Sequence, residues 1–373
     1  MAYSRRKTLG LIGGGAVVAA ASGLGLFAAT RTPGTALAPW DIAGQYPDPR
    51  LRALSYALLA PNPHNRQPWE AELIGDDMVH IWRDPARNLP VTDPHARQLT
   101  IGMGCFLDLM RMAAAEEGYA IDQTLFPNGD DGPVAVCRFV PGAAQPDPLF
   151  RHVMNRRSHK EVFLDRTLDP TALGAIATHV DVIALNAEAA ALRDLASEAW
   201  LIEAKTPEAW KESIDLLRIG KVEINAQPDG IDLGGTMFEL LYKMGALTRE
   251  ASLDLTTMAA QGAINGTLDA IASAPGFVLQ TTPANTRSEQ IETGARWLRL
   301  NLAATGFGLA VRPVSQALQE YRQMSGPYAA IHEAYAPQAG TVQMLGLLGY
   351  AEQTPRTPRW PIDARMRPKT NNA

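Results

Sequence analysis

Two stretches of similar pattern lie 190 residues apart, RQLTIGMGCFLDLMRMAAAEEG at 97–118 and RSEQIETGARWLRLNLAATGFG at 287–308. Laid on one another, they match at Arg97/Arg287, Ile101/Ile291, Gly104/Gly294, Met112/Leu302, Ala113-Ala114/Ala303-Ala304 and Gly118/Gly308, and just beyond at Ile121/Val311. Each predicts a long helix of small and apolar residues that a glycine ends, because glycine readily takes the left-handed conformation that closes a helix.

Similar extended segments flank the two predicted helices. Residues 78–83 and 276–281 precede them, and residues 133–140 and 341–348 follow them. Matched flanks favour an internal duplication, although two helices rich in alanine and glycine can also look alike by chance. We therefore expect a first half at 41–145 and a second half at 146–365.

The second half carries additional, mostly helical sequence near 207–272. Leu233 to Met244 and Ser252 to Ile271 have helical apolar spacing, separated by the turn-forming Pro228-Asp229-Gly230 and other glycines. Residues 220–262 form either a lid over a site or extra packing helices, and the sequence leaves both open.

Composition sets limits on the class of protein. The 373 residues are 46% hydrophobic and 20% charged, which fits a folded protein with a sizeable core. The net charge of -5 provides no general basic field for nucleic acid or an anionic membrane, so any anion site is local. The two cysteines, Cys105 and Cys137, lack disulfide or zinc-site spacing, and we expect buried, unreactive thiols.

Residues 1–40 are predicted to be an export segment. Ser4-Arg5-Arg6-Lys7-Thr8-Leu9 precedes an uncharged run, 9–30, and this layout resembles a twin-arginine signal. The resemblance implies the twin-arginine export machinery as a partner, and a periplasmic protein or one attached to the outer face of the inner membrane. An ordinary N-terminal anchor is the alternative, since about 20 residues can span a bilayer. Ala36-Leu37-Ala38 is the best cleavage site, although Pro39 follows it.

The stretch 60–69, APNPHNRQPW, is the first with evident chemistry. Its prolines and asparagines keep the backbone extended and turned, so that peptide groups are free to meet a planar polar ligand. Side-chain amides that both donate and accept hydrogen bonds match the mixed edge of a heterocycle. The candidate binding residues are Asn62, His64, Asn65 and Gln67.

A second stretch, NRRSHKEVF at 155–163, gathers cations and a hydroxyl. Guanidinium groups bind oxyanions in pairs of hydrogen bonds, so the stretch suits a phosphate or an electron-rich ring edge. Taken alone, such a cluster is more typical of a solvated helix end. The candidates are Arg156, Arg157, Ser158 and Lys160.

Together the two stretches resemble the nitroreductase family of FMN flavoproteins. The family's Asn-x-Gln-Pro-Trp is matched by 65–69, and its Arg-Arg-Ser-x-Arg by 156–160, with Lys160 in the last place. The late helix ending in Gly306-Phe307-Gly308-Leu309 is similar too. The resemblance places Pro313, Val314, Ser315 and Gln316 over the flavin's reactive nitrogen, and Arg356 and Arg359 at a C-terminal phosphate-binding end.

The order of the motifs resembles the Acg-like branch, whose members are single-chain pseudo-dimers. Asn-x-Gln-Pro-Trp lies in the first half and Arg-Arg-Ser in the second, whereas in dimeric members the two reach one flavin from different subunits. The resemblance implies an α+β fold of mainly antiparallel sheets flanked by helices, duplicated into a monomeric pseudo-dimer. One FMN site is expected per chain, at the seam.

The resemblance also implies the activity. Arg156 and Arg157 would meet the ribityl phosphate and the N1/O2 edge of the ring, while electrons pass through FMN to a small acceptor such as a nitroaromatic or quinone, with NAD(P)H as a candidate donor. No protein nucleophile, metal site or Rossmann motif is indicated. A non-catalytic protein that stores FMN is the alternative, and a module that has lost its ligand is a third reading.

Overall fold

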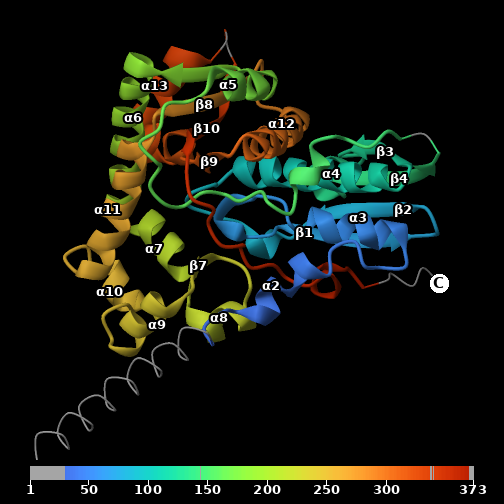
Figure 1. The fold of residues 1–373 in the computed structure, drawn as a ribbon, viewed down its shortest axis with the longest axis horizontal. Helices are drawn as coiled ribbons and strands as arrows, with labels where there is room; N and C mark the ends of the chain where they lie inside the picture. The colour runs from blue at the N-terminus through green and yellow to red at the C-terminus, as the bar shows by residue number, and fades with distance from the viewer. Residues whose placement is uncertain (1–29, 143, 337, 339, 369–373) are drawn as a thin grey trace, which may run out of the picture.

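Two four-stranded sheets form the framework of the chain (Figure 1). The computed structural model describes residues 30–142, 144–336, 338 and 340–368. The first sheet has the order β1 (Trp69–Ile74), β2 (Met78–Arg83), β4 (Ala135–Pro141), β3 (Tyr119–Leu125). The second has the order β5 (Val182–Leu185), β8 (Gly276–Thr282), β10 (Thr341–Tyr350), β9 (Leu309–Pro313). All neighbouring strands in both sheets are antiparallel, which confirms the predicted α+β class.

The two sheets have the same topology. In each, a long helix connects the second strand to the third, and the fourth strand pairs between those two. The extended segments expected at 78–83, 133–140, 276–281 and 341–348 are β2, β4, β8 and β10. An internal duplication would produce this match, and it stays our proposal for its origin.

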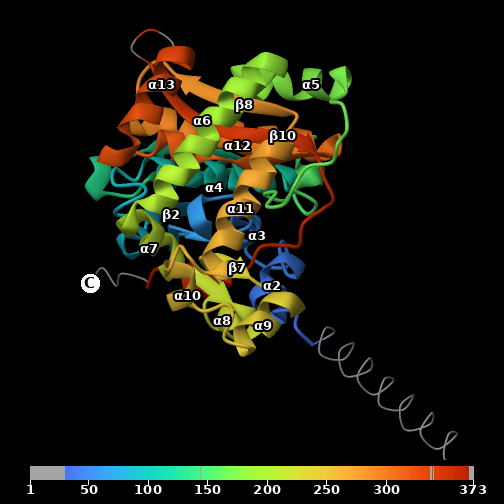
Figure 2. The same cartoon turned by 90° about the vertical axis from the view of Figure 1, so that its left-hand side faces the viewer.

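The connecting helices, α4 (Arg97–Glu116) and α12 (Arg287–Gly306), pack on one another between the sheets (Figures 1 and 2). Their contact is reciprocal and very close. A Cβ atom on Gly104 would lie 2.1 Å from the Ile291 carbonyl oxygen, and one on Gly294 would lie 2.0 Å from that of Ile101. Only glycine permits this approach. Gly118 and Gly308 follow the two helices with φ of 81° and 71°, as predicted.

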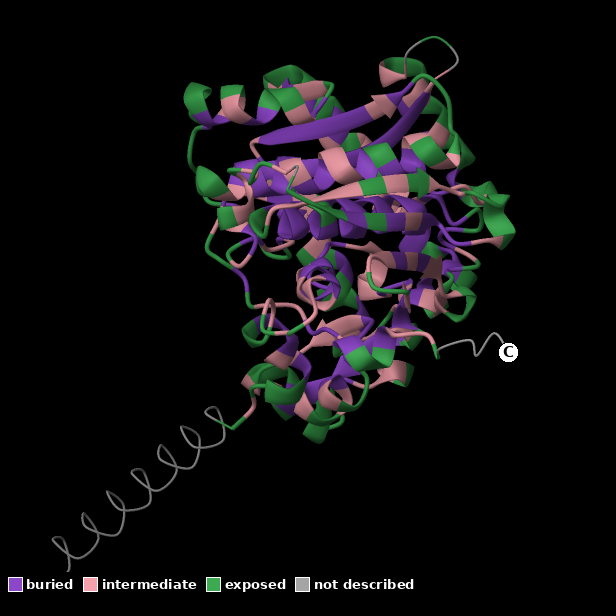
Figure 3. Ribbon diagram, turned by 90° about the vertical axis from the view of Figure 1, so that its right-hand side faces the viewer, coloured by how far each residue is buried: buried purple, intermediate pink, exposed green. Residues whose placement is uncertain are grey.

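One hydrophobic core joins the two halves. It includes Phe106 and Met110 of α4, Trp297 and Leu298 of α12, and Trp69, which stacks on Phe106 at a ring-centroid distance of 4.7 Å. Figure 3 shows the buried residues concentrated in the central helices and sheets. A second core lies between the second sheet and α6 (Asn186–Lys205). Because both halves contribute to the first core, the seam between them is closely packed.

The additional sequence near 207–272 forms a subdomain with its own small core. It contains α7 (Pro207–Asp215), α8 (Gly220–Ala226), α9 (Thr236–Lys243), α10 (Arg249–Leu253) and α11 (Met258–Ser273), with the short parallel strands β6 (Leu217–Ile219) and β7 (Ile231–Leu233). The helical spacing at 252–271 is divided between α10 and α11, because Thr257 caps α11 through the Ala260 amide.

The remaining segments wrap the two halves. The helices α2 (Gly34–Asp41) and α3 (Pro49–Ala57) precede the first sheet, whereas α5 (Pro170–Ile176) and α13 (Ser325–Tyr335) belong to the second half. After β10 the chain returns to the first half, where the Arg367 amide donates to the Ala71 carbonyl at 2.8 Å. In the part of the chain that the structure describes, no helix is both long and apolar enough to cross a membrane.

Candidate functional site

A pocket of about 160 Å³ opens at the seam between the halves. The first half contributes Pro61, Asn62, Pro63, His64, Gln98, Ile101, Gly102 and Cys105, and the second contributes Ser158, Trp297, Pro313, Ser315, Gln316, Gln319 and Met344. Six predicted residues are thus brought together: Asn62, His64, Ser158, Pro313, Ser315 and Gln316. Val314 lies beneath them, buried, and its amide donates to Leu345 O at 3.0 Å.

The loop that forms one pocket wall has an unusual backbone. His64, Asn65 and Gln67 have φ of 47°, 50° and 49°, a region that residues other than glycine seldom adopt. Three of the four residues from 64 to 67 therefore have this conformation. Surrounding hydrogen bonds hold them in place, and among these the Gln67 amide donates to Asn62 Oδ1 at 2.7 Å. Backbone strain of this kind is concentrated at functional sites.

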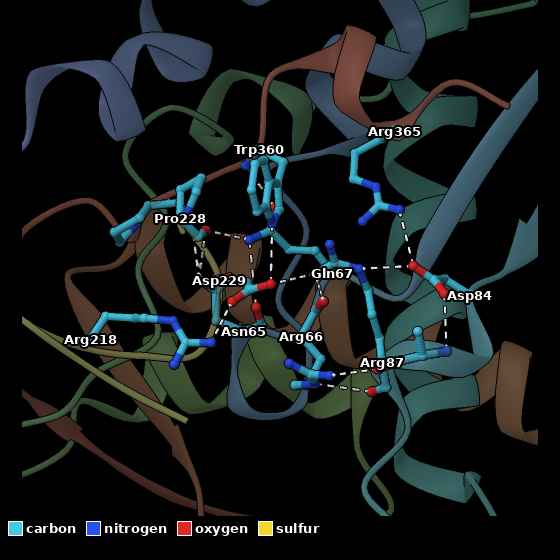
Figure 4. Close-up of polar contacts among 12 residues, drawn as sticks. Asn65, Arg66, Gln67, Asp84, Arg87, Arg218, Pro228, Asp229, Trp360 and Arg365 are labelled. Carbon is cyan, nitrogen blue, oxygen red and sulfur yellow. Dashed lines mark hydrogen bonds and ion pairs between the residues drawn. The ribbon is translucent and has the colours of Figure 1, made fainter. Parts of the chain in front are cut away.

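Asn65 and Gln67 themselves do not line the pocket. Gln67 Nε2 donates to Pro228 O at 2.7 Å, and Gln67 Oε1 accepts from the Trp360 amide at 2.9 Å (Figure 4). Asn65 Nδ2 donates to Pro358 O at 3.1 Å. These amides join the 61–67 loop to the subdomain and to the C-terminal segment, and their predicted contact with a cofactor ring stays a prediction.

Asp229 is the centre of a buried ionic network beside this loop (Figure 4). It pairs with Arg87 at 2.6 Å and with Arg218 at 2.9 Å, and accepts from Trp360 Nε1 at 3.2 Å. Burial raises the pKa of Asp229, but the Trp360 hydrogen bond and the arginine charges outweigh it and hold this pKa below its ordinary value. Sequence reasoning treated Asp229 only as part of a turn, because its partners are distant in the chain.

Two arginines lie behind the pocket without a carboxylate partner among the described residues. Arg156 and Arg359 are 3% and 2% exposed, and both donate to the Leu59 carbonyl, at 2.9 and 3.1 Å. Burial lowers the pKa of Arg156 to about 10, and burial together with the Arg156 charge lowers that of Arg359 to about 9. Burying two neighbouring cations is costly, and an anion would offset that cost.

Two further arginines complete this group around Trp40. The guanidinium groups of Arg157, Arg356 and Arg359 lie 5.1, 5.5 and 5.9 Å from the centroid of the Trp40 ring. The Nε atoms of Arg157 and Arg359 are buried and have no hydrogen-bond partner within the described residues. We call Arg156, Arg157, Arg356 and Arg359 the arginine cluster. The cluster contains residues from both segments that the sequence predicted to bind phosphate, the stretch 155–163 and the C-terminal segment.

Ser158 connects the arginine cluster to the pocket. Arg156 Nη1 donates to Ser158 Oγ at 3.4 Å, and Ser158 lines the pocket wall. The fourth predicted residue of this stretch, Lys160, points elsewhere and forms an ion pair of 2.5 Å with Asp232 of the subdomain. Of the four predicted residues of this stretch, Ser158 lines the pocket and the other three lie outside its lining.

A buried carboxyl that sequence reasoning missed lies next to the pocket. Glu203 is 2% exposed and accepts from Gln319 Nε2 at 2.7 Å. Ser213 Oγ lies 3.5 Å from Glu203 Oε1 and 3.4 Å from His64 Nε2. Burial raises the pKa of Glu203 to about 7 and lowers the pKa of His64. His64 Nδ1 has no partner among the described residues, so it can bind a ligand or a water.

Both cysteines are buried and free, as expected. Cys105 nevertheless lines the pocket, where its thiol donates to Gly294 O at 3.0 Å. Burial raises its pKa to about 12, so the thiol stays protonated and is a poor nucleophile. No group of three or more potential metal ligands occurs among residues that the structure describes.

Comparison with known proteins finds a sequence relative that matches part of the chain. A stretch of 79 residues, 21% of this chain, is 37% identical to Acg of Mycobacterium tuberculosis, a putative NAD(P)H nitroreductase, and the match is the same in two strains. The chain spans about a quarter of that relative's length, 24%. The resemblance to the Acg-like branch is confirmed over this stretch. No protein-family model matches the chain.

Solved nitroreductases resemble the chain distantly. A putative nitroreductase from Anabaena variabilis aligns with a TM-score of 0.39 and 11% identity, over 79% of this chain and 82% of that one. The FMN-dependent nitroreductase NfnB from Mycobacterium smegmatis, solved in complex with NADPH, aligns with a TM-score of 0.35 and 18% identity, over 59% and 97%. Scores this low do not by themselves indicate a shared function.

Proposed function

We propose that this chain is an FMN-dependent oxidoreductase that reduces a small planar acceptor, such as a nitroaromatic or a quinone. The observation that carries the proposal is the arginine cluster beside the seam pocket, with Arg156 and Arg359 buried and Ser158 joining the two. A phosphate bound there would supply the missing negative charge, and a ring in the pocket would lie within reach of Ser158.

The pocket residues fit a flavin ring. Asn62, Gln98 and Gln316 offer amides that donate and accept hydrogen bonds, while Ile101, Trp297 and Met344 supply apolar contacts that exclude water. Two-electron transfer between a donor and the acceptor is the chemistry that FMN would supply when bound. The chain's own residues would bind and orient the two reactants, and His64, whose pKa burial lowers, would present its Nδ1, unpaired within the described residues, to the bound group.

The donor we propose is NAD(P)H, because the Acg relative is described as a putative NAD(P)H nitroreductase. A flavin store is the second candidate. It is favoured by the covering of the arginine cluster: Trp40 of α2 is 1% exposed, and the Arg359 amide donates to Ala36 O at 2.9 Å. Such a cover would slow the release of a bound flavin.

The absorption spectrum of the purified full chain is the first test. We expect a flavin band, or its appearance after incubation with FMN. Bleaching by NAD(P)H followed by reoxidation with a nitro compound or a quinone would support the enzyme, whereas bleaching only by dithionite would favour the store. A chain that never takes up FMN would refute both.

Substitution separates FMN binding from a module that has lost its ligand. Arg156→Met and Arg359→Met should each weaken FMN binding at least tenfold, because a charge-assisted contact to phosphate is worth about 1.5–3 kcal/mol. The matched control is Arg138→Met, which removes an arginine that is half exposed on β4. Equal FMN affinity in all three variants would rule out the arginine cluster as the phosphate site.

A further inference from the structure

Helix α9 buries its one acidic side chain and exposes most of its apolar ones. Glu239 is 6% exposed and pairs with Arg31 at 2.8 Å, and its carboxylate also accepts from the Lys221 amide. Met237 and Met244 are 65% and 62% exposed, and Phe238, Leu240 and Tyr242 are about 40% exposed. A surface helix of a soluble domain normally shows the opposite arrangement.

Neighbouring elements of the subdomain carry further exposed apolar side chains. Val222 of α8 and Met258 of α11 are 81% and 86% exposed, and Leu253 ends α10. Figures 1 and 2 both place α8, α9 and α10 together at one end of the molecule. Eight of the thirteen exposed large apolar residues found in the described part of the chain lie between Val222 and Met258. We call these eight the α9 patch. A concentration of this kind marks an interaction surface.

The uncharged run at 9–30 enters the described structure beside the α9 patch. Lys221 Nζ donates to Thr30 O at 3.0 Å, and Arg31 pairs with Glu239 of α9 itself. A run of this length and composition is long enough to span a bilayer. A bilayer that held residues 9–30 would therefore lie close to the α9 patch.

The residues that follow the run belong to the fold. Ala36 is 1% exposed, its amide donates to Asn225 Oδ1 at 3.0 Å, and its carbonyl accepts from the Arg359 amide. Cleavage at Ala36-Leu37-Ala38 would cut within α2 and remove the contacts of Arg31 and Ala36. These contacts favour retention of the segment from Thr30 to Asp41.

We propose that the α9 patch docks on the apolar region of a phospholipid bilayer, and that the run at 9–30 is retained as a tether to the same bilayer. Apolar contact supplies the docking, because a net charge of -5 does not attract anionic lipid. The surface is distinct from the seam pocket and does not depend on the proposed flavin chemistry.

An environment-sensitive dye at position 237 tests the docking separately from the tether. The full chain carries Met237→Cys, and the matched control carries Thr124→Cys on β3, an exposed site on the first sheet. Native Cys105 and Cys137 are buried and should not react. With phosphatidylcholine vesicles, the dye at 237 should shift to shorter wavelength and the dye at 124 should not.

The other outcomes overturn the proposal. If the chain sediments with vesicles while the dye at 237 stays in water, the tether alone binds. A blue shift without vesicles that grows with protein concentration would assign the α9 patch to a second copy of the chain. The intact mass of the exported protein tests retention, and an N-terminus at Pro39 would refute it.

Discussion

Arg156 and Arg359 both donate to the Leu59 carbonyl oxygen. If Arg156 is replaced, this oxygen still accepts a hydrogen bond from Arg359. We expect the ligand-free Arg156→Met variant to be at least as stable as the natural chain, because an apolar side chain replaces a buried cation that lacks a countercharge. Added FMN should raise the melting temperature of the natural chain more than that of the variant. Thermal unfolding with and without FMN measures both. A large loss of stability in the ligand-free variant would show that Arg156 is chiefly structural.

Glu203 should make the stability of the fold fall as pH rises. Its pKa is raised from 4.5 to about 7 in the folded chain, so the folded state binds more protons than the unfolded state between these values. The contribution of Glu203 to the free energy of unfolding is therefore greatest below about pH 4.5. It is lost progressively as the pH rises through about 7, by roughly 3 kcal/mol in all.

Urea unfolding of Glu203→Gln at pH 5 and pH 8 tests this dependence. The decline between the two pH values should be smaller in the variant, because an amide does not ionise. The matched control is Glu161→Gln, at an exposed position. The same decline in Glu203→Gln as in the natural chain would mean that Glu203 is ionised throughout.

Among the elements, the crossing of α4 and α12 is the most sensitive to side-chain size. In Gly104→Ala the new methyl group would lie 2.1 Å from a backbone oxygen, so the helices must separate. We expect a loss of about 3 kcal/mol. Gly266→Ala in α11 is the control, because a Cβ there has nothing within 4 Å, and it should be neutral or stabilising by up to ~1 kcal/mol. Denaturant unfolding compares the two, and similar stabilities would contradict the close crossing.

The sequence pattern located many of these elements because their signals are local. Trp69 begins β1, in which apolar and acidic residues alternate as a half-buried strand requires, and Met78 to Arg83 is β2. Gly118 and Gly308 end their helices because few other residues adopt positive φ. The continuous spacing at 252–271 was misleading, because the Thr257 cap interrupts it without changing the apolar period.

Across the whole molecule, the Asp229 network joins three parts of the chain. Arg218 and Asp229 belong to the subdomain, Arg87 to the first half and Trp360 to the C-terminal segment. Asp229→Ala would leave Arg218 buried without its carboxylate, at a cost of roughly 3–5 kcal/mol. We expect faster hydrogen exchange in 207–272 and in the C-terminal segment, measured by mass spectrometry. Unchanged exchange in both segments would show that the network is not what holds them.

The sequence by itself determined the two glycine-ended helices, because they depend on short-range periodicity. Through the resemblance of its compact motifs to a known family, it also implied the α+β class and six of the residues that line the seam pocket. Only the tertiary structure decided which way the side chains of these motifs point. Asn65 and Gln67 turn toward Pro358 and Pro228, Lys160 turns toward Asp232, and Glu203 lies beside the pocket. The partners in each case are distant along the chain, so their proximity is a property of packing that no local pattern encodes.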